Sequence, residues 1–385
     1  MAAWVASCQS KHSDVSTWTT IWATLAWSFQ QLYNGTHPLT DHEGRPWPPG
    51  SYGARMAGKP IAPGVFFGVV HRITGDLEWC ANRLGCQNLQ PNVGRPCAWR
   101  SADRDRVPFK DLRMEADWVG TIIQHPQPRP NVFPVWGIIG ISIFTLAIDL
   151  MHCGDLGILL HFIGTCIFTF VFEGPFGGTR SERVDAVWHI VQREYAAQNI
   201  SCRFSRLELG MFCKRDSPHS EFPLLKAKAA ESRSLLPVVL VLCNELNTGS
   251  ERDQTRLLCA VHLSRFYATV HAAGHVPTPD EYEKLRRAAF DAMLPYMKLS
   301  FHAASVEGQY LWNIVNKHHL FLHLALQSKH LNPECVWAYP FEDLMGRSQR
   351  VAMACKRGVP LVMVPSSYMI KYRRVLHCAL GAFRD

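Results

Sequence analysis

The segment Ile138–Gly157, IIGISIFTLAIDLMHCGDLG, decides how the rest of the chain is interpreted. Its first half, Ile138–Ile148, is largely apolar and rich in β-branched residues and glycine, which is typical of a fully buried strand. Asp149 follows at the carboxyl end of that strand, the place where α/β sheets present ligand-binding groups. The sequence therefore predicts a buried strand that ends in a carboxylate.

A membrane hairpin is the alternative for the same region. The two apolar runs, Phe133–Ile148 and Leu156–Phe172, are each shorter than the roughly eighteen uninterrupted apolar residues of a usual membrane span. Asp149, His152 and Asp155 lie between them and would have to occupy a tight loop at one membrane face. The buried strand is the preferred interpretation.

Composition describes an ordinary globular protein. The chain has 385 residues, of which 47% are apolar and 19% charged, and this excludes disordered, collagenous and coiled-coil proteins. Lys and Arg outnumber Asp and Glu by 40 to 32, an excess that favours a polyanionic partner. The 13 cysteines include no C-x-x-C pair and follow no secretory signal, so we expect reduced thiols in the cytosol or nucleus.

Few strands come early in the chain and many helices come late. Strands are expected at residues 65–73, 138–148 and 335–339. Capping patterns at Thr179…Glu182, Ser205…Glu208 and Thr278-Pro-Asp-Glu281 predict helix starts. Helices are expected near residues 17–33, 114–123, 156–172, 179–198, 223–247, 251–273, 280–300, 310–329, 341–356 and after 365. The fold class is therefore α/β and helix-rich overall.

Acidic residues follow the predicted strands. Asp76 and Asp149 come after the first two, and Glu342 or its neighbour Asp343 comes after the third. Carboxylates delivered in this way can share Mg²⁺ or Mn²⁺, and two such ions about 4 Å apart can hold the oxygens of a phosphoryl transfer in line. For each acid alone, a helix cap or a solvated surface charge is the simpler explanation.

The pattern Asp149-x-x-His152, followed by a helix rich in small residues, resembles the second aspartate motif of eukaryotic cut-and-paste DNA transposases of the CACTA type. Gly75-Asp76-Leu77-Glu78 resembles their first aspartate region. The segments 317–323 (KHHLFLH) and 336–343 (VWAYPFED) resemble the part that carries the final acid. One departure concerns a Cys-x-x-Cys pair that relatives often hold between the first two acids, because here Cys97 is followed by Arg100 in place of the second cysteine.

The resemblance implies an RNase H-like core with a large helical insertion. Residues 1–63 would form an N-terminal helix and a Pro/Gly-rich segment, 64–178 the first part of the core, 179–300 the insertion, and 301–385 the last part of the core with basic helices. Asp76, Asp149 and Glu342 would hold Mg²⁺ or Mn²⁺, and His152 would orient a carboxylate or a phosphate. The implied function is DNA cleavage and strand transfer in the nucleus, with DNA and a second copy of the chain as the expected partners. The alternative is an inactive mobile-element remnant that only binds DNA.

Several other side chains are candidates for binding. Cys80, Cys86 and Cys97 are buried free thiols or, less simply, metal ligands. His318, His319 and His323 are expected on a helix face near the site or DNA, and Trp312 and Trp337 are candidates for base stacking. A basic set on the two C-terminal helices would contact a phosphate backbone or form solvated helix faces. It comprises Arg347, Arg350, Lys356, Arg357, Lys371, Arg373 and Arg374.

Overall fold

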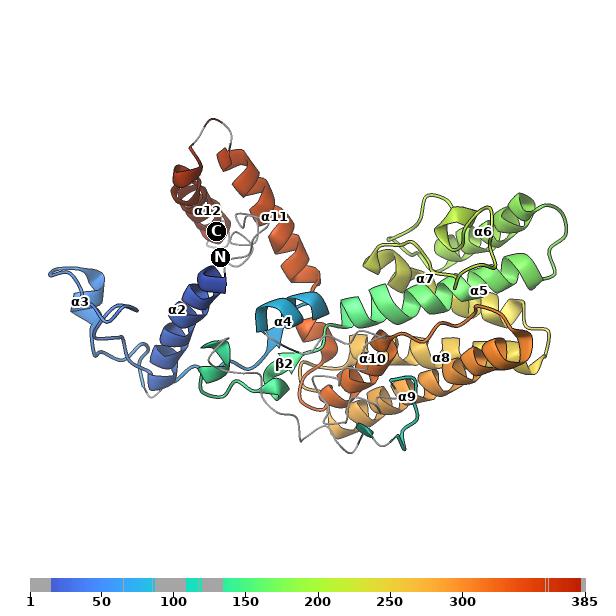
Figure 1. Ribbon diagram of the computed structural model, residues 1–385, viewed down its shortest axis with the longest axis horizontal. Coiled ribbons are helices and arrows are strands. Elements are labelled where there is room, and N and C mark those ends of the chain that lie inside the picture. Colours follow the sequence, from blue (N-terminus) through green and yellow to red (C-terminus); the bar gives the residue numbers. More distant parts are fainter. Residues whose placement is uncertain are drawn as a thin grey trace.

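The computed structural model describes residues 15–64, 66–84, 86, 109–116, 118–119, 134–356, 358 and 360–381. Figure 1 shows an elongated molecule with three parts. A block of packed helices forms one end, a small strand pair with short helix α4 (Leu77–Leu84) lies in the middle, and the other end carries α2 (Val15–Asn34), α3 (Tyr52–Met56) and a helical hairpin. The prediction of a helix-rich protein is confirmed.

The helical block holds most of the core. Its members are α5 (Leu159–Glu173), α6 (Arg180–Ala197), α7 (Ala229–Glu245), α8 (Glu251–Ala272), α9 (Pro279–His302) and α10 (Asn316–Gln327). Most of α5 is buried among the others, including aromatic side chains such as Phe162, Phe168 and Phe170. Burying an aromatic side chain of this size removes about 150–250 Å² of surface from water, so these rings supply much of the stability of the block.

Capping side chains begin the helices of the block where the sequence predicts. Thr179 starts α6 and Thr278 starts α9, each in a reciprocal pair with a glutamate three residues later. These side chains satisfy backbone N–H groups that have no partner inside the helix. The predicted cap at Ser205…Glu208 is wrong, because only the 3₁₀-helix Leu209–Met211 follows it.

Two other predicted helices are shorter than expected. α7 begins at Ala229 instead of residue 223, and α10 begins at Asn316 instead of residue 310. Trp312 has a φ of 57°, a left-handed conformation that ends any helix before it. Half of the helix expected at 114–123 lies outside the described residues.

Strands are far fewer and shorter than predicted. Among the described residues, the only named sheet is a parallel pair, β1 (Ile73–Thr74) and β2 (Leu146–Ala147), with Thr74 opposite Ala147. The long strand expected at 138–148 is wrong. Gly140 turns the chain at a φ of 85°, and the Ser142 side chain caps a 3₁₀-helix at Ile143–Thr145.

The third expected strand, at 335–339, is also wrong. Asn332 caps a 3₁₀-helix over Pro333–Val336, and the proline occupies its first turn, where a missing N–H costs nothing. Of the first expected strand, only Ile73 and the following Thr74 are in extended pairing, and Val65 lies outside the described residues. β-Branched composition alone therefore overstated the length of the sheet.

A π-helix, η5 (Met151–Ile158), connects β2 and Asp149 to α5. Such helices are rare, usually one turn long, and frequent at functional sites. Gly154 and Gly157 let other side chains approach its backbone. A Cβ at Gly154 would lie 2.4 Å from the Tyr267 hydroxyl, and one at Gly157 would lie 2.8 Å from Cδ of Lys317.

The helix Met151–Glu173, formed by η5 and α5 together, is long and apolar enough to cross a membrane, but 78% of its most apolar window is buried inside the protein. A helical hairpin would need a second long helix before it. The described residues there, 134–148, hold two 3₁₀-helices and β2 instead. In this structure the segment Met151–Glu173 is therefore a core helix.

The hairpin of α11 (Tyr339–Lys356) and α12 (Val364–Gly381) projects away from the helical block (Figure 1). It has a small core of its own, formed by Cys355, Val364 and Tyr368. Many of its other apolar side chains are exposed. The hairpin thus packs largely on itself.

Gly164 lies where α5 meets the segment before α7. A Cβ added there would lie 2.6 Å from the backbone nitrogen of Leu225, which donates a hydrogen bond to the Leu160 carbonyl. Backbone atoms cannot move aside as a flexible side chain can. We therefore expect Gly164→Ala to lower the free energy of unfolding by about 1–3 kcal/mol, measured by urea denaturation, although alanine favours helix by about 1 kcal/mol.

Gly346 on α11 is the matched control, because the nearest atom to an added Cβ is a flexible Arg350 nitrogen at 3.9 Å. Gly346→Ala should leave stability unchanged or raise it by up to about 1 kcal/mol. Equal stability of Gly164→Ala and the wild type would contradict the packing described for α5.

Candidate active site

Asp76 and Asp149 occupy equivalent places in the parallel strand pair. Each lies two residues beyond the end of its strand, and the last residues of the two strands, Thr74 and Ala147, are paired. Both acids therefore leave the same edge of the sheet. This edge lies in the middle of the molecule, near α4 and β2 in Figure 1.

Asp76 is exposed and begins α4. Its Oδ1 accepts a hydrogen bond of 2.6 Å from the backbone N–H of Trp79, as a helix cap does. Its Oδ2 has no hydrogen-bond partner among the described residues. Asp76 is therefore an exposed helix cap.

Asp149 is almost fully buried, at 3% exposure, and all of its hydrogen-bonding capacity is used. Oδ1 accepts from the backbone N–H groups of Met151 and Ala338, at 3.0 and 2.8 Å. Oδ2 accepts from the backbone N–H of His152, at 3.3 Å, and from the ring Nδ1 of the same residue. A carboxylate has about four lone-pair sites, so these four donors saturate it.

His152 connects Asp149 to the third predicted acid. Its Nδ1 contacts Asp149, and its Nε2 lies 3.6 Å from Oε1 of Glu342. The hydrogen bond to Asp149 raises the pKa of His152, and the charges of Glu342 and Asp76 add to this effect. The imidazole of His152 thus lies between the carboxylates of Asp149 and Glu342, which come from two separate segments of the chain.

Glu342 and Asp343, the two candidates for the third acid, face different partners. Glu342 faces His152 from the first turn of α11. Asp343 instead pairs with Arg347 one turn further along α11, at 2.7 Å. His152 therefore lies between Asp149 and Glu342, Asp76 leaves the same edge of the sheet as Asp149, and Asp343 is directed elsewhere.

The donor set has the chemistry of a divalent-cation site, because Mg²⁺ and Mn²⁺ prefer carboxylate oxygens. Asp76 and Glu342 both have oxygens open to solvent. Within the described part of the chain, however, no three His, Cys, Asp or Glu side chains are gathered closely enough to share an ion. Asp149 would have to exchange one of its four donors, and the half-exposed ring of His152 is the one that solvent reaches.

The predicted cysteines include two that the structure describes. Cys80 and Cys86 are buried, and burial raises the pKa of both thiols, that of Cys86 to about 12, as expected for buried free thiols. Cys97 lies outside the described residues.

The histidines of α10 are packing residues, contrary to the prediction that they face the site or DNA. His318, His319 and His323 are at most 2% exposed. The rings of His319 and His323 lie against Trp118, with ring centres 4.4 and 4.7 Å away. Trp312 is fully buried as well, so its predicted role in base stacking is wrong.

The predicted basic set lies on the projecting hairpin. Arg347 is paired with Asp343, and Lys371 donates to the Ala354 carbonyl. Arg350, Lys356, Arg373 and Arg374 are exposed and have no ion-pair partner among the residues the structure describes. Arg357 lies outside those residues. The hairpin therefore presents several cations to solvent.

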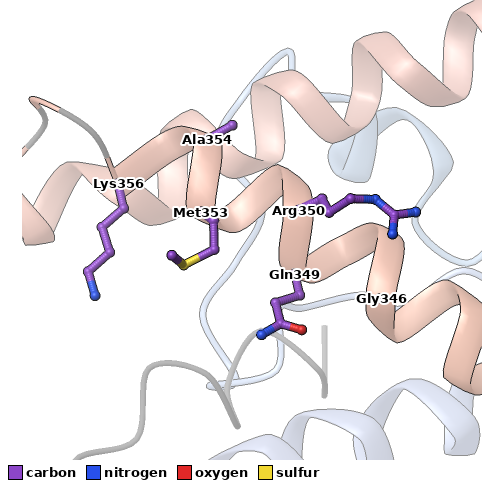
Figure 2. Close-up of a pocket in the computed structure, with 6 residues that line it drawn as sticks. All are labelled: Gly346, Gln349, Arg350, Met353, Ala354 and Lys356. Atoms are coloured by element: carbon purple, nitrogen blue, oxygen red, sulfur yellow. The ribbon is translucent and has the colours of Figure 1, made fainter.

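A cavity of about 680 Å³ lies along α11, starting one turn after Glu342. Its described lining includes Gln349, Arg350, Met353 and Lys356. Figure 2 shows Gln349 and Lys356 pointing to the same side of the helix, with Arg350 directed toward another side. The exposed basic residues of α11 thus border an open hollow.

Sequence reasoning missed a second set of polar residues beside the acids. Lys317 reaches the π-helix and donates to the Leu156 carbonyl at 2.8 Å, and burial lowers its pKa. Asp155 is buried and accepts hydrogen bonds from Tyr267, Tyr339 and Arg233. The only signal available in the sequence was an acid within a strongly apolar stretch, because the partners come from distant segments.

No family model, curated protein or solved structure matches this chain. Its function therefore has to be inferred from the site itself.

Asp155 gives the protein a pH dependence that can be measured. Burial raises the pKa of Asp155 to about 6, and the attraction of Arg233 only partly opposes this. The folded protein therefore keeps a proton that the unfolded chain releases above its ordinary value of 3.8. Stability from this group is present below about pH 4 and is lost as the pH rises through 6.

We expect the difference in unfolding free energy between the wild type and Asp155→Asn to fall by about 3 kcal/mol from pH 4 to 7. Urea denaturation of both proteins across this range measures it, and groups common to both cancel. A difference that does not change with pH would contradict the raised pKa.

Proposed function

We propose that the protein is a transposase-like enzyme that cleaves and joins DNA strands with Mg²⁺ or Mn²⁺, on an RNase H-like core interrupted by the helical block. The observation that carries this proposal is the position of His152 between Asp149 and Glu342, with Asp76 near enough to affect its pKa. Their order along the chain matches the Asp-Asp-Glu arrangement that the motifs resemble.

The buried and the exposed residues of the site have different proposed roles. Asp149 is rigid because four donors hold it, and Asp76 and Glu342 face solvent, where DNA has access. The neighbouring carboxylates raise the pKa of His152, which favours the protonated ring, and its charge would attract a phosphate. A bound divalent cation would polarise the scissile phosphodiester and lower the pKa of the attacking oxygen.

The projecting hairpin is the proposed DNA contact. Its exposed cations follow the same helix that carries Glu342, so DNA bound along α11 passes the acids. Neutralising phosphates with Lys and Arg gives affinity without sequence preference. The proposal places the protein in the nucleus, bound to DNA as a homo-oligomer.

A second function is favoured by one observation. The saturated hydrogen bonding of Asp149 leaves no lone pair for a cation in this arrangement. A mobile-element remnant that binds DNA without cutting it would have this property. A single experiment distinguishes the two functions.

That experiment is nicking of supercoiled plasmid DNA by the purified full chain with Mn²⁺. If the protein is an enzyme, Asp149→Asn should lower the initial rate by about 100-fold or more, because the variant removes the central carboxylate charge while keeping its size. Chelation of the metal should abolish nicking.

Asp343→Asn is the matched control, because this acid neighbours Glu342 but pairs with Arg347. Its rate should stay within about 3-fold of the wild type, as expected for an exposed ion pair. Plasmid binding without nicking by the wild type would select the remnant.

DNA binding should depend on the hairpin. The double variant Arg350→Ala/Lys356→Ala should weaken binding to a duplex by about 10-fold at roughly 100 mM KCl and reduce the slope of log affinity against log salt by about 2. Fluorescence anisotropy over a range of salt concentrations measures both quantities.

The variant Arg287→Ala/Lys298→Ala removes the same charge from exposed positions of α9 and serves as the control. An equal loss of affinity in both double variants would show that the net charge of the protein determines its affinity for DNA. It would contradict the assignment of the hairpin as the contact surface.

A further inference from the structure

Asp155 lies in the same π-helix as His152 but faces the helical block. Its side chain is fully buried, with no exposed surface. Oδ1 accepts a hydrogen bond of 2.7 Å from Tyr267 of α8. Oδ2 accepts from Tyr339 at the start of α11, at 2.8 Å, and from Arg233 of α7, at 3.0 Å. One carboxylate therefore joins three helices that are distant in the sequence.

Arg233 strengthens the connection to α11 in a second way. Its guanidinium lies 4.4 Å from the ring centre of Trp337 and 4.7 Å from that of Tyr339. A planar guanidinium over aromatic rings gains cation–π attraction while it keeps its hydrogen bonds. The two residues on either side of Ala338 are therefore held by the helical block.

The same short segment is held on its other side by the strand pair. The Thr74 hydroxyl donates to the Val336 carbonyl at 2.8 Å, and the Ala338 N–H donates to Asp149 at 2.8 Å. The Ala338 carbonyl then accepts the N–H of Glu342 at 2.8 Å. Glu342 thus follows directly from a segment fixed at both sides.

We propose that Asp155, Arg233 and Tyr339 are positioning residues that fix the first turn of α11 and so hold the Glu342 carboxylate beside His152 and Asp149. This inference rests on the proposed function, because it assigns the helical block a role in setting the third acid. The block would then act on catalysis without contacting DNA at the site.

The test compares two hydroxyls that donate to the same carboxylate. Tyr339→Phe removes the hydrogen bond that reaches the segment before Glu342, and Tyr267→Phe removes the one that reaches α8. Both variants keep their rings and should show similar, small decreases in melting temperature. A general loss of stability would therefore affect both alike.

Three readouts distinguish positioning from stability. In plasmid nicking, Tyr339→Phe should lower the rate about 10-fold and raise the half-saturating Mn²⁺ concentration about 3-fold or more, whereas Tyr267→Phe stays within about 2-fold of the wild type. Amide hydrogen exchange over residues 339–346 should be faster in Tyr339→Phe alone. Arg233→Lys keeps the charge but not the planar stack, so its nicking rate should lie between those of Tyr339→Phe and the wild type.

Equal effects of the two tyrosine variants, or none, would overturn the inference while leaving the proposed function intact. A wild type that does not nick DNA would defeat the proposed function. In that case amide hydrogen exchange alone tests whether these residues position the start of α11. Faster exchange at 339–346 in Tyr339→Phe supports a fixed start of α11, and unchanged exchange overturns it.

Discussion

The carboxylate of Asp149 is the interaction on which the rest of the structure depends. Its four hydrogen bonds join the end of β2, the first turn of the π-helix and the segment that leads into α11. A buried charge is costly unless it is fully paired, so these partners have to be in place together. The helical block, the strand pair and the projecting hairpin meet at this one side chain.

Much of the outline was predictable because it depends on local chemistry. The capping pairs at Thr179 and Thr278 act within four residues, and the acids after the predicted strands, Asp76 and Asp149, do lie at one edge of a parallel pair. The strand lengths were not predictable. Gly140 and Asn332 redirect apolar segments into 3₁₀ turns that β-propensity does not register.

The partners of the site were beyond the reach of sequence patterns because they are long-range. Nothing near Asp155 in the chain indicates that Tyr267 and Arg233 will bind it, and nothing near Trp312 indicates complete burial. The π-helix was also missed, since the hydrophobic spacing of Met151–Ile158 differs little from that of an ordinary buried helix. Contacts of this kind follow from the packed fold and not from the local sequence.

Helix α11 is held at its first turn, and the rest of it projects from the helical block. The helix has 18 residues and is therefore about 27 Å long, and Glu342 lies within its first turn, next to the fixed end. A tilt of about 10° about that end would move the far tip by roughly 5 Å but Glu342 by less than about 1 Å. If the hairpin binds DNA as proposed, its tip would follow the bends of different duplexes while Glu342 stays beside His152.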